Sequence, residues 1–246
     1  MQVAALEDAS PESRELAKII RQLGNILPDD ASFNWQESRR WCAKILGEYV
    51  AKSKKSKKLI KQLEGVRYVV GGDEHFLAHV SSEPNRIYKL THTDNFGCRS
   101  YFSRHDPDLT GRHFHGTGNA DPFFYLKRWL LLNSISEFQT RFEGIVPPLQ
   151  SAWLPMICIS QPTLGPKNPT QGEIINAMAN YDFIKISQDA FLDPSSELLL
   201  TDAAPRNVRI VGGIPVPFDA IAQVASIETM DWVWESEIIR KKPQIV

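Results

Sequence analysis

The chain has 246 residues, of which 42% are hydrophobic and 23% charged, as in an ordinary globular protein with one large domain or two smaller lobes. Its formal net charge of −1 excludes a protein whose whole surface binds polyanions, although a local basic patch stays open. No apolar run approaches the ~20 residues of a membrane span, the N-terminus lacks the pattern of a secretion signal, and the cysteines are few and scattered, so we expect a cytoplasmic protein without disulfides.

The first 65 residues predict a helical extension. Ser10-Pro11 pairs a helix N-cap with a proline at the first helical position. Apolar residues then recur at helical spacing: Leu16, Ile19, Ile20, Leu23 and Leu27. A second helix is expected from about Asn34 to Val50. We interpret the following KSKKSKK, residues 52–58, as a solvated turn and helix face, with an anion-binding patch as the less favoured alternative.

The pattern changes to strands at Val66. Three short runs, VRYVVGG, EHFLAHVSS and RIYKLT, predict an antiparallel meander joined by a glycine turn and by the turn EPN. Residues 94–120 are rich in glycine, histidine, aspartate and arginine and predict a long loop. A helix should begin after Asp121, which is followed by Pro122.

The remaining chain predicts two more strands, FEGIVPP and LPMICISQP, and a proline-rich linker, residues 160–170. A helix begins at Thr170 and covers residues up to 183, and short strands follow in ELLLTD, NVRIVGG and IPVPFDAI. The tail has room for about one helix. Two lobes joined by a stiff linker favour a ligand cleft between them.

Oxygen-bearing side chains flank the last predicted strands. Asp202 and Asn207 are five positions apart, and the predicted hairpin returns Asp219 to their side. Carboxylate and amide oxygens suit Mg²⁺, which often shares its ligands with phosphates. Phosphoryl transfer uses such a set: a carboxylate that orients a hydroxyl, oxygen ligands for the metal, and a cation for the phosphates.

The cation expected on another strand is Lys89. Strand alternation places Ile87 and Lys89 on one face, so that an aliphatic side chain could cover a nucleobase while the amine contacts phosphates. Gly71 and Gly72, between the first two strands, would let the backbone approach those phosphates.

Several of these segments resemble the protein-kinase-like fold. DAAPRN resembles its catalytic loop, D-x-x-P-x-N, FDAI stands where that fold has D-F-G, and IYKL resembles the strand that bears the kinase lysine. Together with GGDEHFLAHV, FEGIV and ISQP, in this order over roughly residues 66–225, they are similar to the small kinase-like domains of bacterial and phage polyvalent proteins.

The resemblance implies an α+β, two-lobed protein. Residues 1–65 would precede an N-lobe with a small antiparallel sheet, residues 66–160, and a shortened, mostly helical C-lobe, residues 161–246. The implied function is an ATP- and Mg²⁺-dependent phosphotransferase that transfers the γ-phosphoryl group to a hydroxyl of a protein or small molecule. We expect neither a membrane nor a nucleic acid among its partners.

The resemblance also implies the role of each site residue. Asp202 would be the catalytic aspartate, Asn207 and Asp219 would hold Mg²⁺, and Lys89 would contact the α- and β-phosphates. Ser160 and Gln161 would lie at the hinge, where the backbone meets the adenine edge. Gly71, Gly72 and Ile87 would complete the nucleotide site.

The sequence departs from the kinase pattern in ways that favour an alternative, a pseudokinase that acts as an interaction module. The helix after Asp121 has no glutamate to pair with Lys89; Phe124 stands in that place, with Glu137 and Glu143 as substitutes. Only 27 residues follow Asp219, too few for the usual helices that bind a peptide acceptor.

Two other interpretations are less favoured. His105, His113 and His115 could bind zinc, but a polar loop near the cleft is the preferred interpretation. A nucleic-acid or lipid-surface protein would use the lysine run. His75 could contact phosphate or pack against the glycine turn, and both options stay open.

Overall fold

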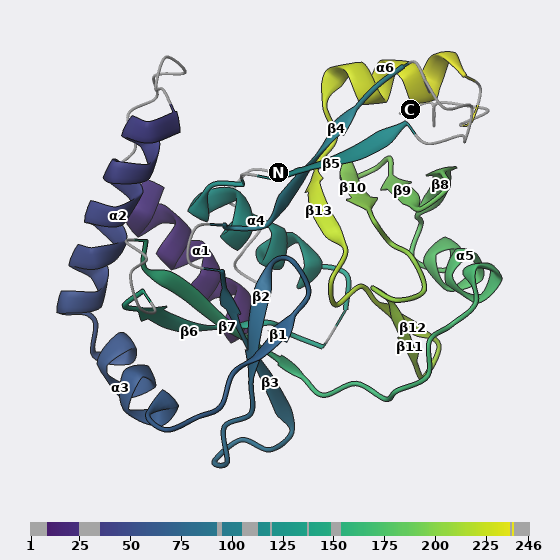
Figure 1. Cartoon of the computed structure of the whole chain (residues 1–246). Coiled ribbons are helices and arrows are strands. Elements are labelled where there is room, and N and C mark those ends of the chain that lie inside the picture. Colours follow the sequence, from purple (N-terminus) through teal and green to yellow (C-terminus); the bar gives the residue numbers. More distant parts are fainter. Residues whose placement is uncertain are drawn as a thin grey trace. The chain divides into compact units, whose positions relative to one another are not determined.

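The computed structural model describes residues 9–24, 35–92, 95–104, 113–118, 120–136, 138–148, 154–236 and 238. In this part the protein is α+β, with helices and antiparallel sheets (Figure 1). The chain forms two compact units. We call Gln2–Cys98 with Gly118–Leu164 the first unit, and Arg99–Thr117 with Gly165–Val246 the second unit.

The first unit contains a five-stranded antiparallel sheet with the order β1-β2-β3-β7-β6. Its strands are β1 (Val69–Gly71), β2 (His75–Ala78), β3 (Arg86–Thr91), β6 (Arg141–Val146) and β7 (Met156–Pro162). All five were expected from the alternating or apolar runs described above, and the structure confirms them.

Four helices accompany this sheet: α1 (Pro11–Gly24), α2 (Trp35–Lys52), α3 (Lys54–Leu63) and α4 (Pro122–Leu132). The caps that the sequence predicts are present. The hydroxyl of Ser10 accepts a hydrogen bond from the Ser13 amide at 3.1 Å, and Asp121 accepts from the amides of Phe123 and Phe124 at 2.8 Å. The lysine run proves to be mostly helix, since α3 begins directly after its N-cap, Ser53.

One face of the sheet is packed against α3 (Figure 1). Leu59 and Leu63 of α3 lie in a single buried cluster with Tyr88 and Leu90 of β3. Gly144 of β6 permits the close approach, because a Cβ there would lie 3.2 Å from a methyl group of Leu59 and 3.3 Å from the Ser56 backbone. The amide of Ile145 donates to the Ser56 hydroxyl at 3.1 Å, which satisfies a backbone group on β6, an edge strand of the sheet.

The second unit is built mainly from short strands. A four-stranded sheet has the order β13-β10-β9-β8, and two-stranded ribbons are formed by β11 with β12 and by β4 with β5. The elements are β4 (Cys98–Phe102), β5 (Phe114–Gly118), α5 (Gln171–Ala179), β8 (Ile184–Ser187), β9 (Ala190–Asp193), β10 (Leu198–Thr201), β11 (Arg209–Val211), β12 (Ile214–Val216), β13 (Ile221–Val224) and α6 (Ile227–Glu235).

The structure corrects three expectations about this unit. The predicted loop at residues 94–120 contains β4 and β5, and β8 and β9 were missed altogether. The region from residue 161 onward, expected to be mostly helical, has only the two short helices α5 and α6 among its described residues. The ribbon depends on distant packing, since Phe102, His113 and Phe114 surround the Trp232 ring of α6 at centroid distances of 4.6–6.4 Å.

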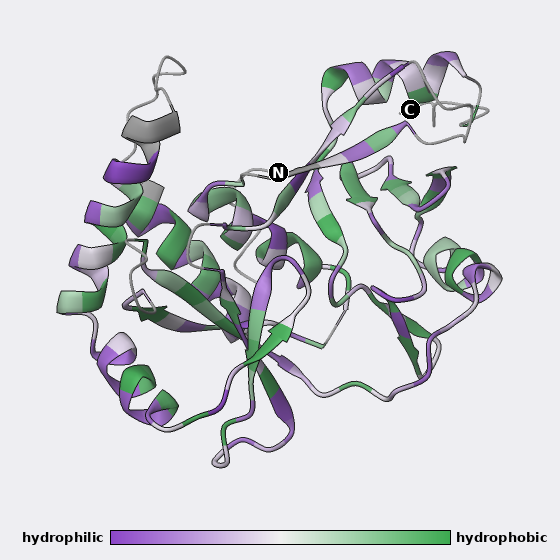
Figure 2. Ribbon diagram, in the orientation of Figure 1, coloured by the Kyte–Doolittle hydropathy of each residue, from purple (hydrophilic) through white to green (hydrophobic). Residues whose placement is uncertain are grey.

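In the part of the chain that the structure describes, no helix combines the length and apolar character needed to cross a membrane. Figure 2 shows both hydrophilic and hydrophobic residues on α2, α3, α5 and α6.

Candidate functional site

Lys89 lies in the middle of β3, with Leu77 of β2 and Ile159 of β7 as its cross-strand neighbours. Its side chain is 7% exposed. As predicted, Tyr88 and Leu90 point into the cluster beneath α3, so Ile87 and Lys89 occupy the opposite face of the sheet. We call this the Lys89 face.

Apolar side chains share the Lys89 face of the sheet. The register pairs Val69 with Leu77 and Leu77 with Lys89, which puts these three residues on one face. Val69 is 58% exposed, and Leu77 and Ile87 are only half-buried. The Lys89 face thus combines a buried cation with apolar side chains, the two kinds of group that a planar ring carrying a phosphate would contact.

The glycine turn closes the hairpin of β1 and β2. A Cβ on Gly71 would lie 2.3 Å from Cγ of Leu77, so a larger residue would displace that leucine. Gly72 has a φ of 85°, in the left-handed region that glycine adopts without strain, and a Cβ there would contact nothing within 4 Å. The turn therefore leaves backbone accessible, as expected for a loop that approaches phosphates.

Helix α4 holds the residues that follow the turn. Arg128 donates to Glu74 at 2.7 Å, and the second oxygen of Glu74 accepts from the Cys98 amide at 2.9 Å. His75 is buried, with its Nε2 3.0 Å from the Tyr125 hydroxyl. Burial raises the pKa of Tyr125 well above its usual value, so the phenol stays protonated. His75 therefore packs against α4 rather than lying open to solvent.

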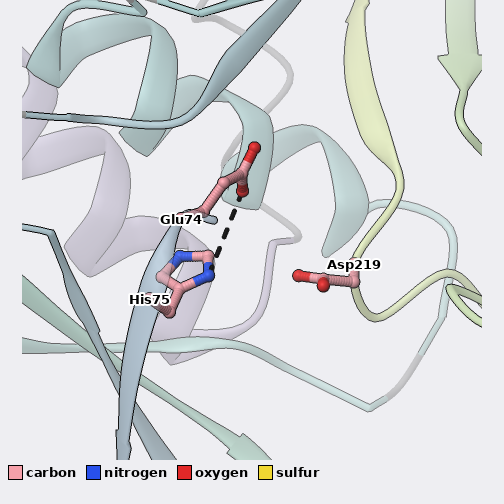
Figure 3. Close-up of side chains that lie close together, drawn as sticks. All are labelled: Glu74, His75 and Asp219. Atoms are coloured by element: carbon pink, nitrogen blue, oxygen red, sulfur yellow. Dashed lines mark ion pairs between the residues drawn. The ribbon is translucent and has the colours of Figure 1, made fainter. Parts of the chain in front are cut away.

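Figure 3 draws Glu74 and His75 at the start of β2, with Oε2 of Glu74 4.0 Å from Nδ1 of His75. Asp219, also labelled there, belongs to the second unit and is described with it.

The same helix provides an aromatic neighbour for Lys89. Nζ of Lys89 lies 5.4 Å from the centroid of the Trp129 ring, and the guanidinium of Arg128 lies 4.8 Å from that centroid. Sequence reasoning had assigned Phe124 to the position facing Lys89. The available signal was the spacing of Tyr125, Arg128 and Trp129, which places these three side chains on one helix face.

The side chains of Ser160 and Gln161 of β7 are buried and hydrogen-bonded. The Ser160 hydroxyl donates to Glu143 at 2.6 Å and accepts from Nε of Arg86 at 2.8 Å, and its carbonyl accepts from Arg86 at 2.7 Å. Gln161 donates to the Thr140 hydroxyl at 3.0 Å. Because Ser160 stands opposite Tyr88, Glu143 is engaged on the sheet face away from Lys89. The other candidate partner, Glu137, lies outside the described residues.

The three oxygen-bearing residues of the second unit lie in one system of loops. The side-chain amide of Asn207 donates to the Asp202 carbonyl at 2.8 Å, and the amide of Asp219 donates to the Asn207 carbonyl at 3.2 Å. Antiparallel pairing of β10 with β13 sets Thr201 opposite Ile221. Asp202, directly after β10, and Asp219, shortly before β13, therefore lie at the same end of this strand pair. Backbone groups and the side-chain amide of Asn207 thus connect Asp202, Asn207 and Asp219 in one system of loops.

Asp202 is held in an unusual backbone conformation. Its φ is 51°, in the left-handed region, which costs a non-glycine residue on the order of 1–2 kcal/mol. Its carboxylate accepts from Arg206 at 2.5 Å while remaining 41% exposed. Asp182 and Glu197 adopt the same left-handed conformation, which aspartate tolerates more readily than most residues.

This arrangement fits a hard divalent cation. Since the Asn207 nitrogen bonds to a backbone carbonyl, its amide oxygen stays available as a neutral ligand, and Asp219 offers a charged one. An oxygen-only donor pair of mixed charge matches the preference of Mg²⁺ for few protein ligands plus water and phosphate.

Arg209 of β11 is a further residue that sequence reasoning missed. Its Nε donates to the Gly165 carbonyl at 3.1 Å, and its Nη1 lies 3.4 Å from the carbonyls of both Pro205 and Arg206. The guanidinium also lies 4.6 Å from the Phe218 ring centroid. One side chain therefore connects the linker, the loop that follows Asp202 and the residue before Asp219.

The zinc alternative receives no support from the described residues. His113 lies 3.1 Å from the Ser103 carbonyl through Nδ1 and packs on Trp232, while His115 packs on Tyr101 at 5.3 Å. Within the described part of the chain, neither ring belongs to a group of three metal-binding side chains. His105 lies outside the described residues.

A scan of protein-family models finds none that matches the chain, and searches of curated proteins and of solved structures likewise find no match. The functional argument therefore rests on the side chains described above.

Proposed function

We propose that the protein is an ATP- and Mg²⁺-dependent phosphotransferase that acts on a hydroxyl acceptor. The observation that carries the proposal is the convergence of Asp202, Asn207 and Asp219 through the contacts of Asn207 with both aspartates. Phosphoryl transfer uses a carboxylate that orients the acceptor hydroxyl and oxygen ligands for the metal, and these three residues supply both kinds of group.

The first unit supports the proposal with a second set of residues. Lys89 is buried on the third strand of an antiparallel sheet, the strand that bears the phosphate-binding lysine in protein kinases. The glycine turn closes the hairpin of β1 and β2, and Val69, Leu77 and Ile87 share the sheet face of Lys89. Val69, Leu77 and Ile87 would contact the base, and Lys89 would contact the phosphates.

In the proposed reaction, the carboxylate of Asp202 accepts the proton of the acceptor hydroxyl. The acceptor oxygen forms a bond to the γ-phosphorus, the bond from that phosphorus to the β,γ-bridging oxygen breaks, and ADP leaves with that electron pair. Asn207 and Asp219 would hold Mg²⁺, which when bound neutralises charge on the phosphate oxygens. Arg206 orients the Asp202 carboxylate by donating a hydrogen bond to it at 2.5 Å.

The alternative is a nucleotide-binding pseudokinase. Active protein kinases pair this lysine with a glutamate of a helix, whereas α4 has no glutamate in its sequence and places the Trp129 ring 5.4 Å from Nζ of Lys89.

The test combines binding and turnover. Unfolding midpoints are measured with ATP, with and without MgCl₂, and phosphate release and self-labelling are followed with γ-labelled ATP. We expect ATP with Mg²⁺ to raise the midpoint of the wild type and of Asp202→Asn, because a ligand of the native state stabilises it. Asp202→Asn should lower transfer by about 10³-fold or more, as removal of a catalytic base does.

Variants at the other residues separate the alternatives. Lys89→Met should lose the stabilisation by ATP, and Asp219→Asn should lose only the part that depends on Mg²⁺. Equal stabilisation of wild type and Asp202→Asn without any transfer by either would establish the pseudokinase. If ATP changed the unfolding midpoint of the wild type under none of these conditions, both the phosphotransferase and the nucleotide-binding pseudokinase would be refuted.

A further inference from the structure

The lysine run divides into two kinds of residue in the structure. Nζ of Lys55 lies 2.7 Å from both carboxylate oxygens of Glu15 on α1, and Lys52 pairs with Glu48 at 3.3 Å. Lys55 therefore connects α3 to α1, whereas Lys52 forms an exposed pair within α2. The other three lysines of the run are exposed, as is Lys61 further along α3, and we call these four the α3 basic face: Lys54, Lys57, Lys58 and Lys61.

The α3 basic face is a single stripe. Its members occupy positions i, i+3, i+4 and i+7, which share one side of a helix and span about 10 Å along the axis. The opposite side of α3 is fixed, because Leu59 and Leu63 are 1% and 6% exposed in the core of the first unit. Among the described residues, no carboxylate lies within ion-pair distance of any of the four ammonium groups.

The four lysines of the α3 basic face destabilise the protein when no ligand is bound. Lys54 and Lys57 lie near the positive end of the helix dipole, and the first turn of α3 has no acidic residue to balance them. Lys54 repels Lys57 and Lys58, and Lys61 repels the same two residues, since all four pairs are three or four positions apart. A ligand that supplies negative charge would relieve both effects.

The charge is also local. The chain has 28 basic and 29 acidic residues, so without these four lysines 24 basic residues would face 29 acidic ones. The remaining protein is therefore acidic and would repel a polyanion, which restricts attraction to this helix and the region around it.

We propose that the α3 basic face binds the phosphate backbone of a nucleic acid without sequence preference. Duplex DNA carries one negative charge per about 1.7 Å of axis, so a row of about 10 Å meets several phosphates. The face has no aromatic or amide side chain fully exposed to contact bases, and the apolar residues of α3 are committed to the core rather than available for lipid. The inference goes beyond phosphoryl transfer and does not depend on it.

The test measures binding of the full chain to a labelled 20-base-pair duplex of arbitrary sequence by fluorescence anisotropy. Because four phosphate contacts give a slope of about −3.6 in log K against log salt, we expect affinity to fall about 100-fold between 50 and 200 mM salt. Replacing the four lysines with glutamine should remove most of this slope and weaken binding at 50 mM salt by about 30-fold or more. A second sequence should bind within about threefold of the first.

A matched control replaces four other exposed lysines with glutamine: Lys18, Lys44, Lys127 and Lys185. It makes the same change in net charge, and we expect its affinity to stay within about threefold of wild type. The α3 variant alone should also raise the unfolding midpoint in the absence of ligand at 50 mM salt, because it removes the repulsion.

Three outcomes would overturn the proposal. The first is equal weakening by the α3 variant and the control, which would indicate diffuse attraction. The second is the absence of duplex binding at 50 mM salt. The third is binding to vesicles containing 30% phosphatidylserine, lost in the α3 variant, without binding to the duplex, which would assign the face to a membrane surface.

Discussion

At the scale of single residues, Arg209 of β11 holds several segments of the second unit together, which its position in the sequence does not indicate. Arg209 contacts the Gly165 carbonyl in the linker and the Pro205 carbonyl in the loop that follows Asp202, and it lies against the ring next to Asp219. A guanidinium presents several donors in a fixed plane, which suits a residue that must bond two segments and stack on a third. We therefore assign Arg209 as a positioning residue of the proposed metal site.

Replacing Arg209 tests that assignment. In Arg209→Met we expect the Mg²⁺ concentration that half-saturates the ATP-induced stabilisation to rise about tenfold, since a lost hydrogen bond to a charged group costs about 1.5–3 kcal/mol. Arg209→Lys should rescue little of this, because an ammonium cannot maintain all the contacts at once. Titration of MgCl₂ in a thermal-shift assay supplies the measurement. An unchanged Mg²⁺ dependence in Arg209→Met would show that the arginine only packs.

At the scale of elements, α5 depends on its cap. Thr170 and Glu173 exchange hydrogen bonds in a capping box, with the Thr170 amide donating to the Glu173 carboxylate at 2.7 Å. The bonds from the Thr170 amide and hydroxyl lower the pKa of Glu173 below its usual value. A carboxyl whose pKa is lower in the folded state stabilises the protein above its unfolded pKa, and that contribution disappears as the pH falls through the folded value.

We accordingly expect Glu173→Ala to lower the unfolding midpoint at pH 7 and to converge with wild type below about pH 4. Thermal unfolding of both proteins across pH 3 to 8 provides the measurement. Glu197→Ala, at an exposed turn of the same unit, serves as the control with equal charge change. A difference that stays constant down to pH 3 would mean that the carboxylate bond does not contribute.

The elements also show what the sequence could reveal. Strands β1, β2, β3, β6 and β7 carry apolar residues at period two or in short buried runs, and the caps of α4 and α5 are local signals, so local patterns predict them. The ribbon of β4 and β5 has no such pattern, because its stability comes from Trp232 more than a hundred positions later. The same holds for Trp129, whose position beside Lys89 follows from tertiary packing.

For the candidate site, residue types proved more predictable than contacts. Asp202, Asn207 and Asp219 are close in sequence, and a hairpin between them suffices to bring them together. The environment of Ser160 and the pairing of Glu74 with Arg128 involve partners 17 to 74 positions away, and no local rule selects them.

At the scale of the whole molecule, each unit has its own core. Leu59 belongs to the cluster beneath the sheet of the first unit, whereas Leu199 belongs to a separate cluster with Leu192 and Val233 in the second unit. Removing a fully buried leucine costs about 2–5 kcal/mol. Each substitution should therefore lower the local stability mainly of the unit that loses the side chain.

We expect Leu59→Ala to increase amide hydrogen exchange in β3 and β7 more than in β10 and β13, and Leu199→Ala to do the reverse. Hydrogen exchange followed by mass spectrometry of peptides from both units supplies the comparison. If either substitution accelerated exchange equally throughout, the two cores would belong to one cooperative unit.

The assignment of residues 99–117 to the second unit has a consequence for synthesis on the ribosome. The chain leaves the first unit after Cys98, returns at Gly118 and leaves again after Leu164. Phe102, His113 and Phe114 therefore leave the ribosome more than a hundred residues before Trp232, the ring around which they pack. Any truncated product that stops before α6 would display these aromatic side chains, and would be an early target for chaperones and proteases.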